Sequence, residues 1–105
     1  MDSKKHFQEI EPFIKKLNQH FAPTKIILFG SRARGERWEN SDYDFIIVSS
    51  AFEGVHWLKR IEAIVELWDL LCDIDILPYT PEEFKKKRRQ IGTVREAVKE
   101  GIILN

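Results

Sequence analysis

The sequence is poor in several features that would point to particular classes of protein. It has one cysteine, Cys72, so it cannot form an internal disulfide, and we expect a reducing, cytoplasmic environment. No apolar run approaches the roughly 20 residues that a membrane helix needs. The formal net charge is zero, which gives no overall attraction to nucleic acid or to a membrane surface. We therefore expect no membrane association and argue against nucleic acid as a partner.

What the chain does contain is enough for one ordinary folded unit. Its 105 residues are 43% hydrophobic and 32% charged, which is typical of a globular protein and not of a disordered one. We find no internal repeat and no low-complexity linker. The expected organisation is a single domain covering residues 1–105.

Hydrophobic spacing predicts the first helix. Apolar residues recur at intervals of three and four over residues 3–21, as one face of a helix requires. They are Phe7, Ile10, Ile14, Leu17 and Phe21. Pro12 lies inside this pattern, so either the helix is kinked there or its regular part begins at Pro12.

Three short apolar runs, residues 25–30, 43–49 and 72–79, predict buried strands. A long amphipathic helix is expected between the second and third, over residues 55–71. Threonine followed three residues later by glutamate, at Thr80 and again at Thr93, predicts two further helix starts with capping boxes. The expected fold is a small α/β or α+β domain, with a three- or four-stranded mixed sheet and helices packed mainly on one face.

Carboxylates gather where two of these strands begin. Strand side chains alternate between faces, so Asp42 and Asp44 share one side, as do Asp73 and Asp75. If the two strands are neighbours, three or four carboxylates converge, and their repulsion calls for a positive partner. An oxygen-only set of ligands suits Mg²⁺ or Mn²⁺ better than Zn²⁺.

The end of the first strand offers a site for anions. Gly30 allows a sharp turn and the close approach of a ligand, and Ser31 opens what we expect to be a short helix over residues 31–34. Arg32 and Arg34 add positive charge, either for phosphate or for ion pairs with nearby glutamates. Phosphate and carboxylates bridged by a divalent metal are what phosphoryl transfer needs.

These residues resemble a known signature. Gly30-Ser31, ten residues, then Asp42-Tyr43-Asp44 is similar to the motif of the DNA polymerase β-like nucleotidyltransferase superfamily. The string "GSRARGERWENSDYDFIIV" resembles its small branch, the minimal nucleotidyltransferases. "DIDILPYTPEEF" and the C-terminal "VKEGIILN" also resemble that branch, so the likeness covers nearly the whole chain.

The resemblance implies roles for individual residues. Asp42, Asp44 and Asp75 would be the catalytic and metal-binding carboxylates, holding two Mg²⁺ ions, with Asp73 as the alternative to Asp75. Gly30, Ser31 and Arg34 would contact the triphosphate, with ATP as the expected substrate. The implied reaction is transfer of a nucleoside monophosphate to a hydroxyl, with release of pyrophosphate.

The resemblance also implies a partner. Small proteins of this branch are often antitoxins of HEPN-domain ribonuclease toxins, and some transfer AMP to a tyrosine of the toxin. The alternative is a non-catalytic antitoxin that neutralises its toxin by stoichiometric contact. Larger superfamily members carry a second, helical domain, so the remaining walls of the site are expected from a partner, from a second copy of the chain, or not at all.

Two further features have alternative readings. Trp57 and Trp68 lie on the apolar stripe of residues 55–71, which is wider than a helix facing a sheet needs, so they belong either to the core or to an interface. The basic run at residues 85–89 permits a nucleic-acid contact but is typical of a solvated helix face.

Overall fold

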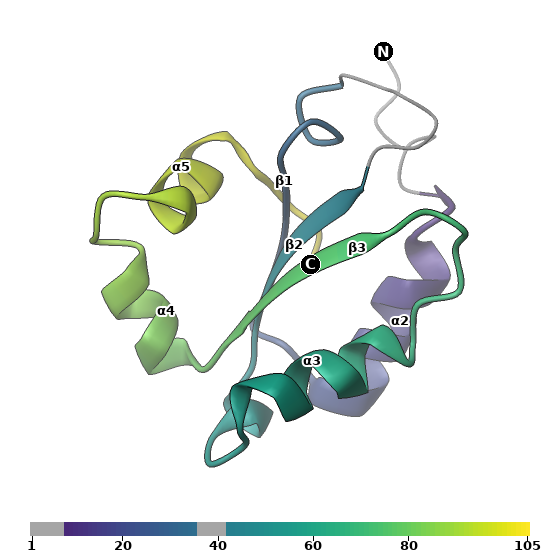
Figure 1. Cartoon of the computed structure of the whole chain (residues 1–105), viewed down its shortest axis with the longest axis horizontal. Helices are drawn as coiled ribbons and strands as arrows, with labels where there is room; N and C mark the ends of the chain where they lie inside the picture. The colour runs from purple at the N-terminus through teal and green to yellow at the C-terminus, as the bar shows by residue number, and fades with distance from the viewer. Residues whose placement is uncertain (1–7, 36–41) are drawn as a thin grey trace.

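The structure is a computed structural model that describes residues 8–35 and 42–105. In this part of the chain, one mixed sheet has the strand order β3-β2-β1-β4 (Figure 1). Its strands are β1 (Lys25–Phe29), β2 (Tyr43–Val48), β3 (Ile74–Tyr79) and β4 (Ile102–Ile103). β1 is antiparallel to both β2 and β4, whereas β2 and β3 are parallel. The predicted mixed sheet is therefore confirmed.

Helices cover both faces of this sheet. Residues of α2 (Glu11–Phe21) and α3 (Trp57–Val65) pack with one face, and residues of α4 (Pro81–Lys87) and α5 (Thr93–Glu100) pack with the other. Figure 1 shows the two pairs on opposite sides of the strands. The fold class is as expected, but the helices are not mainly on one face, because two of the four described helices lie on each side of the sheet.

Alternation along β2 explains why two hydrophobic clusters form. Tyr43, Phe45 and Ile47 join the cluster with α2 and α3, while Ile46 and Val48 join the cluster with α4 and α5. The strand is buried on both faces because successive side chains point to opposite sides. This placement sends Asp44 to the same face as Ile46, and that face carries the candidate site.

The first helix resolves the ambiguity at its proline. α2 begins at Glu11 with Pro12 in its first turn, so the regular helix starts at the proline and is not kinked by it. Residues 3–7 of the predicted helix lie outside the described residues. α3 is shorter than the predicted helix over 55–71, because residues after Val65 form turns that lead into β3.

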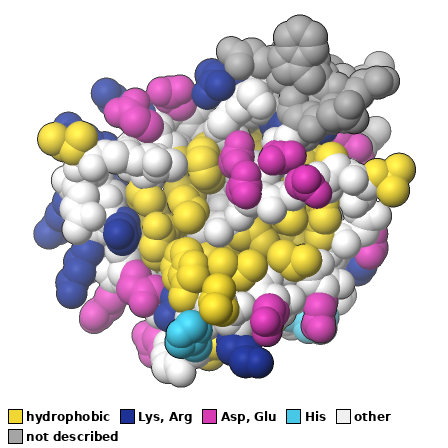
Figure 2. Space-filling view, in the orientation of Figure 1, with side chains coloured by type: hydrophobic (Ala, Val, Ile, Leu, Met, Phe, Trp, Pro, Cys, Tyr) yellow, Lys and Arg dark blue, Asp and Glu magenta, His cyan; other side chains and the backbone are white. Residues whose placement is uncertain are grey.

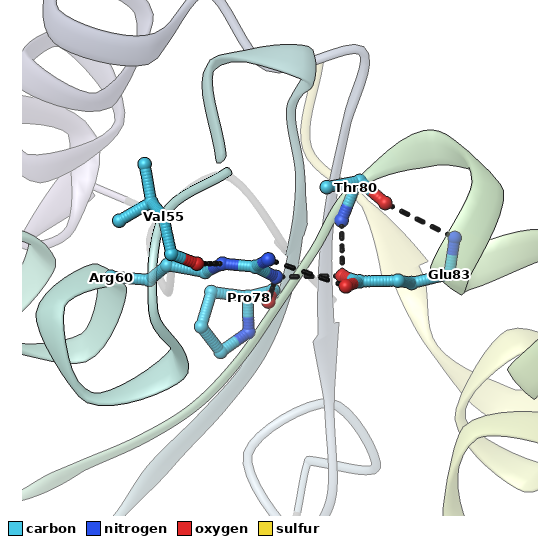
Figure 3. A network of polar contacts seen from close by, with 5 residues as sticks. All are labelled: Val55, Arg60, Pro78, Thr80 and Glu83. Carbon is cyan, nitrogen blue, oxygen red and sulfur yellow. Dashed lines mark hydrogen bonds and ion pairs between the residues drawn. The ribbon is translucent and has the colours of Figure 1, made fainter. Parts of the chain in front are cut away.

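A polar network fixes the junction between α3, β3 and α4. Thr80 caps α4 in the predicted capping box, with Glu83 reaching back to the Thr80 N–H. The buried guanidinium of Arg60 donates to both carboxylate oxygens of Glu83, at 2.6 and 3.2 Å. It also donates to the carbonyl oxygens of Val55 and Pro78 (Figure 3). One side chain thereby joins the start of α3 to the end of β3 and the first turn of α4.

Two local predictions are wrong. α5 begins at Thr93 itself, after Gly92, and no side chain caps it, so the second capping box is not formed. Residues 31–35 form turns and not a short helix, with Ala33 and Arg34 both donating to the Gly30 carbonyl. No helix among the described residues has both the length and the hydrophobicity needed to cross a membrane.

Candidate active site

The centre of the candidate site is a pair of aspartates on neighbouring parallel strands. Asp44 of β2 and Asp75 of β3 are register partners, so their side chains emerge side by side on the same face. Asp44 is half-buried and Asp75 is exposed. Asp73, the alternative to Asp75, lies before β3 begins and is exposed, and its carbonyl accepts the N–H of Tyr43. The register therefore brings Asp75, and not Asp73, directly against Asp44.

The crowding of carboxylates changes the protonation of Asp44. Burial raises the pKa of Asp44 to about 6, and the charge of Asp75, a hydrogen bond with Asp75 and the charge of Asp42 add to this. The positive charge of Arg34 acts in the opposite direction. A carboxylate is held here in surroundings that disfavour its ionised form, as is typical of sites that bind a cation or move a proton.

Gly30 is required by its closeness to Asp44. Its φ of +77° lies in the left-handed region, which residues with a side chain rarely adopt. A Cβ on Gly30 would also collide with the carboxylate oxygen Oδ2 of Asp44. The turn after β1 thus lies directly against the carboxylate, which gives the glycine of the motif a steric reason.

The other predicted site residues surround this pair. Ser31 follows Gly30 and is half-buried, and Arg34 is exposed at the end of the same turn but close enough for its charge to act on Asp44. Asp42 is exposed and precedes β2. The structure therefore brings Gly30, Asp44 and Asp75 into contact, with Asp42 and Arg34 acting on them through their charges.

A divalent metal fits the chemistry of these donors. Two carboxylates in contact, with a third nearby, form the oxygen-rich and negatively charged set that Mg²⁺ prefers. Among the described residues, however, no three His, Cys, Asp or Glu side chains are already arranged to hold an ion. Asp42 is exposed, so its carboxylate would have to turn toward Asp44 to complete such a set.

A second cluster beside the site was missed by sequence reasoning. Tyr43 lies between Asp42 and Asp44 in the sequence, and its side chain points to the opposite face of the sheet. There its hydroxyl donates to Glu9 and accepts from Arg32 at 3.3 Å. The Arg32 guanidinium lies 4.2 Å from the centre of the Tyr43 ring and 3.6 Å from Glu9. Arg32 thus ties the turn to β2 and to Glu9, which precedes α2, so of its two predicted roles the structure shows the ion pair with a glutamate. The only signal in the sequence was the alternation of β2, which sends Tyr43 away from the aspartates.

The chain matches known proteins in both sequence and fold. The family described as "Polymerase beta, Nucleotidyltransferase" matches residues 11–104. A provisionally assigned nucleotidyltransferase from Sulfolobus solfataricus superposes with a TM-score of 0.66 at 18% identity, over 94% of this chain and 78% of that one. Another structure with the same provisional assignment has a TM-score of 0.54 at 26% identity, over 95% of this chain and 98% of that one. No curated protein matches the sequence.

The shape of the domain alone does not identify the family. BolA1 from Arabidopsis thaliana superposes with a TM-score of 0.56 at 22% identity, over 68% of this chain and 89% of that one. At this identity the likeness concerns the fold alone. The assignment therefore depends on the match of the sequence, which includes Gly30, Asp44 and Asp75. Because that match spans nearly all of its length, the chain belongs to the polymerase β nucleotidyltransferase family.

Proposed function

We propose that the protein is a Mg²⁺-dependent nucleotidyltransferase that moves AMP from ATP to a hydroxyl group. The observation that carries this proposal is the contact between Asp44 and Asp75 beside the Gly30 turn, in a chain of the nucleotidyltransferase family. Transfer of a nucleotidyl group requires negative side chains for metal and a backbone turn that a triphosphate can approach closely. Both lie on one face of this sheet.

Each predicted residue has a role in this proposal. Asp42, Asp44 and Asp75 would hold the divalent metal, which when bound offsets the negative charge of the triphosphate. Gly30 would bring the backbone turn close to the triphosphate, while Ser31 offers a hydroxyl and Arg34 a positive charge. Asp75, as the more exposed carboxylate, is placed to accept the proton of an incoming hydroxyl.

We further propose that the acceptor is a tyrosine of a partner protein, with a HEPN-domain toxin as the partner and antitoxin activity as the outcome. The resemblance of "GSRARG" and "DIDILPYTPEEF" to the minimal nucleotidyltransferases supports this choice. Exposed apolar side chains, Leu58 on α3 and Leu71 and Ile91 in the connections, offer further surface to a protein partner. We expect the pair in the cytoplasm, where the free thiol of Cys72 stays reduced.

The test is incubation with ATP labelled at the α-phosphate, Mg²⁺ and the partner protein encoded beside this chain. The expected result is label on a tyrosine of the partner, lost with EDTA and reduced at least about 100-fold by Asp44→Asn. Asp73→Asn is the matched control, because Asp73 is exposed and not in register with Asp44. Label that is absent, or unchanged in Asp44→Asn, contradicts the proposal.

A second candidate function is neutralisation of the partner by contact alone. The observation that favours it is the exposed apolar surface, which needs no chemistry to bind. The double variant Asp42→Asn, Asp44→Asn separates the two functions. If it protects cells from the partner as well as the unchanged chain does, contact suffices. If protection requires both aspartates, transfer is the function.

A further inference from the structure

β3 is an edge strand of the described sheet, so the backbone groups on its outer side have no strand partner there. Among the described residues it pairs only with β2. The Tyr43 N–H donates to the Asp73 carbonyl at 3.1 Å, and the Ser49 N–H donates to the Tyr79 carbonyl at 3.0 Å. Backbone groups of alternate residues point to opposite sides of a strand. Ile74, Ile76 and Pro78 therefore direct their backbone groups outward.

The free edge ends at Pro78. Proline has no N–H to offer, and the Pro78 carbonyl already accepts a hydrogen bond from Arg60 at 3.0 Å (Figure 3). What remains is the backbone of Ile74 and Ile76. These two residues flank Asp75, so the open part of the edge coincides with the candidate site.

Apolar surface continues from this edge. Figure 2 shows hydrophobic side chains gathered across the middle of the same view, with acidic side chains grouped next to them. A hollow of about 330 Å³ is lined by Leu77, Tyr79, Ile91 and Val94, among others. Leu77 and Tyr79 follow Asp75 at intervals of two, so they lie on the same face of β3.

We propose that the edge of β3 at Ile74 and Ile76 is the docking site of the acceptor, an extended segment of a partner protein that adds as a fifth strand. Its hydroxyl-bearing residue lies beside Asp75, and an apolar residue two positions away packs over Leu77. Neighbouring strands are about 4.8 Å apart, which places the acceptor side chain against the Asp75 carboxylate.

Charge and the proline of β3 together argue against a second copy of the chain as the occupant. When two copies of β3 pair antiparallel through both Ile74 and Ile76, Asp75 lies opposite the Asp75 of the other copy. If the register between the two copies slides one way, Asp75 of one copy lies opposite Asp73 of the other. If it slides the other way, Pro78 of one copy lies opposite Ile74 of the other. A phosphate backbone is disfavoured for the same reason, since Asp73 and Asp75 repel it. A segment without carboxylates opposite Asp75 fits best.

The docked hydroxyl then takes part in the proposed function, on which this inference rests. Its oxygen forms a bond to the α-phosphorus of ATP, and the bond from that phosphorus to the oxygen bridging the β-phosphate breaks. Pyrophosphate leaves with the electron pair of the broken bond. The hydroxyl proton passes to a carboxylate oxygen of Asp75, so atoms and charges balance.

The probe is a nine-residue peptide in which threonine and valine alternate around one central tyrosine, with lysine at both ends. We expect saturating peptide to slow hydrogen exchange at the Ile74 and Ile76 amides at least about tenfold, because they become hydrogen-bonded. The Asp75 amide, which faces β2, is the internal control. Methylating one alternate set of peptide amides should remove this protection, and methylating the other set should leave it.

The variant Ile74→Pro removes an outward N–H without removing a bond to β2, so it should fold and lose peptide protection at Ile76. Equal effects of the two methylated peptides, or unchanged exchange at Ile74 and Ile76, overturn the docking site. The docking site is also overturned if the peptide is labelled from ATP equally well by Ile74→Pro and by the unchanged protein. It is overturned too if an RNA oligomer is labelled and the peptide is not. Protection without labelling supports the docking site and contradicts only the proposed transfer.

Discussion

Asp44 and Asp75 face each other across the parallel strands β2 and β3, with the backbone of Gly30 against the Asp44 carboxylate. This arrangement is unfavourable when no cation is bound, because two negative groups share a half-buried face. It is favourable for a cation. The same contact between carboxylates that suggests the function should therefore lower the free energy of unfolding when no metal is bound.

The first prediction is that Asp44→Asn stabilises the protein in the absence of metal. The pKa of Asp44 is raised to about 6 in the folded state, so this carboxyl binds its proton more tightly there than in the unfolded chain. Stability then falls as pH rises from about 4 to about 6. Because solvent screens part of this effect, we expect Asp44→Asn to raise the free energy of unfolding by about 1 kcal/mol at pH 7.5 and not at all at pH 4. Urea unfolding measures both values.

The exposed Asp73 gives the matched control for this prediction. Asp73→Asn removes the same charge but not the register contact with Asp44, and it should change the unfolding free energy little at either pH. If Asp44→Asn is destabilising at pH 7.5, or if its effect does not depend on pH, Asp44 does not lie in repulsive surroundings.

The second prediction concerns Gly30. Gly30→Ala should lose at least about 1 kcal/mol through its left-handed backbone, and more because the new methyl group collides with Asp44. Gly54→Ala is the matched control, since Gly54 has a φ of +75° and open space around it. Thermal unfolding should show the larger loss for Gly30→Ala, together with loss of nucleotidyl transfer. Equal losses would mean that the Asp44 carboxylate moves aside freely.

Much of the fold follows from hydrophobic pattern alone. The strands at residues 25–29 and 43–48 and the start of α4 at Pro81 lie within a residue or two of their predicted positions, because buried runs and a complete capping box are local signals. The helix after Val55 is overestimated. Its apolar pattern continues to Leu71, but the residues beyond Val65 form turns. In these turns Trp68 packs against Phe13.

The site was only partly predictable, for a physical reason. Spacing could put Asp42 with Asp44 and Asp73 with Asp75, but the choice of Asp75 depends on the register between β2 and β3, which is a tertiary property. Both tryptophans are partly buried and pack against a core cluster, Trp68 on one face of the sheet and Trp57 on the other, and the Trp68 indole N–H donates to the Cys72 carbonyl. The sequence left the role of Arg32 open between phosphate and an ion pair, because its partners Tyr43 and Glu9 are distant in the sequence.

The third prediction is that Tyr43→Phe destabilises the protein by about 1 kcal/mol, because the Tyr43 hydroxyl links Glu9 to Arg32. The buried hydroxyl also has a raised pKa, caused first by burial and then by its bond to Glu9. Tyr79→Phe is the control, since the Tyr79 hydroxyl has no hydrogen-bond partner within residues 8–35 and 42–105. Chemical unfolding compares the two. Equal effects would show that the Tyr43 network adds no stability.

The fourth prediction concerns the Arg60 network in Figure 3. Arg60→Ala removes a buried guanidinium, leaves the Pro78 carbonyl without its donor and leaves the Glu83 carboxylate with the Thr80 N–H alone, so we expect a loss of about 3 kcal/mol. Glu83→Gln should cost about 1 kcal/mol, because the Glu83 side chain is 45% exposed and its bond to Arg60 is partly screened. Urea unfolding at pH 7 measures both.

The pH dependence of Glu83→Gln gives this prediction a sharper form. Its hydrogen bond with Arg60 lowers the pKa of Glu83 below its usual value, so the stabilisation is present above that usual value and is lost as pH falls through the lowered one. The difference between the unchanged protein and Glu83→Gln should therefore be full at pH 7 and disappear in strong acid. Glu82→Gln, at an exposed neighbour in the same helical turn, should show no such difference. A difference that persists in strong acid would mean that the amide disturbs the capping of α4 by Thr80, and that the charge of Glu83 is not what holds Arg60.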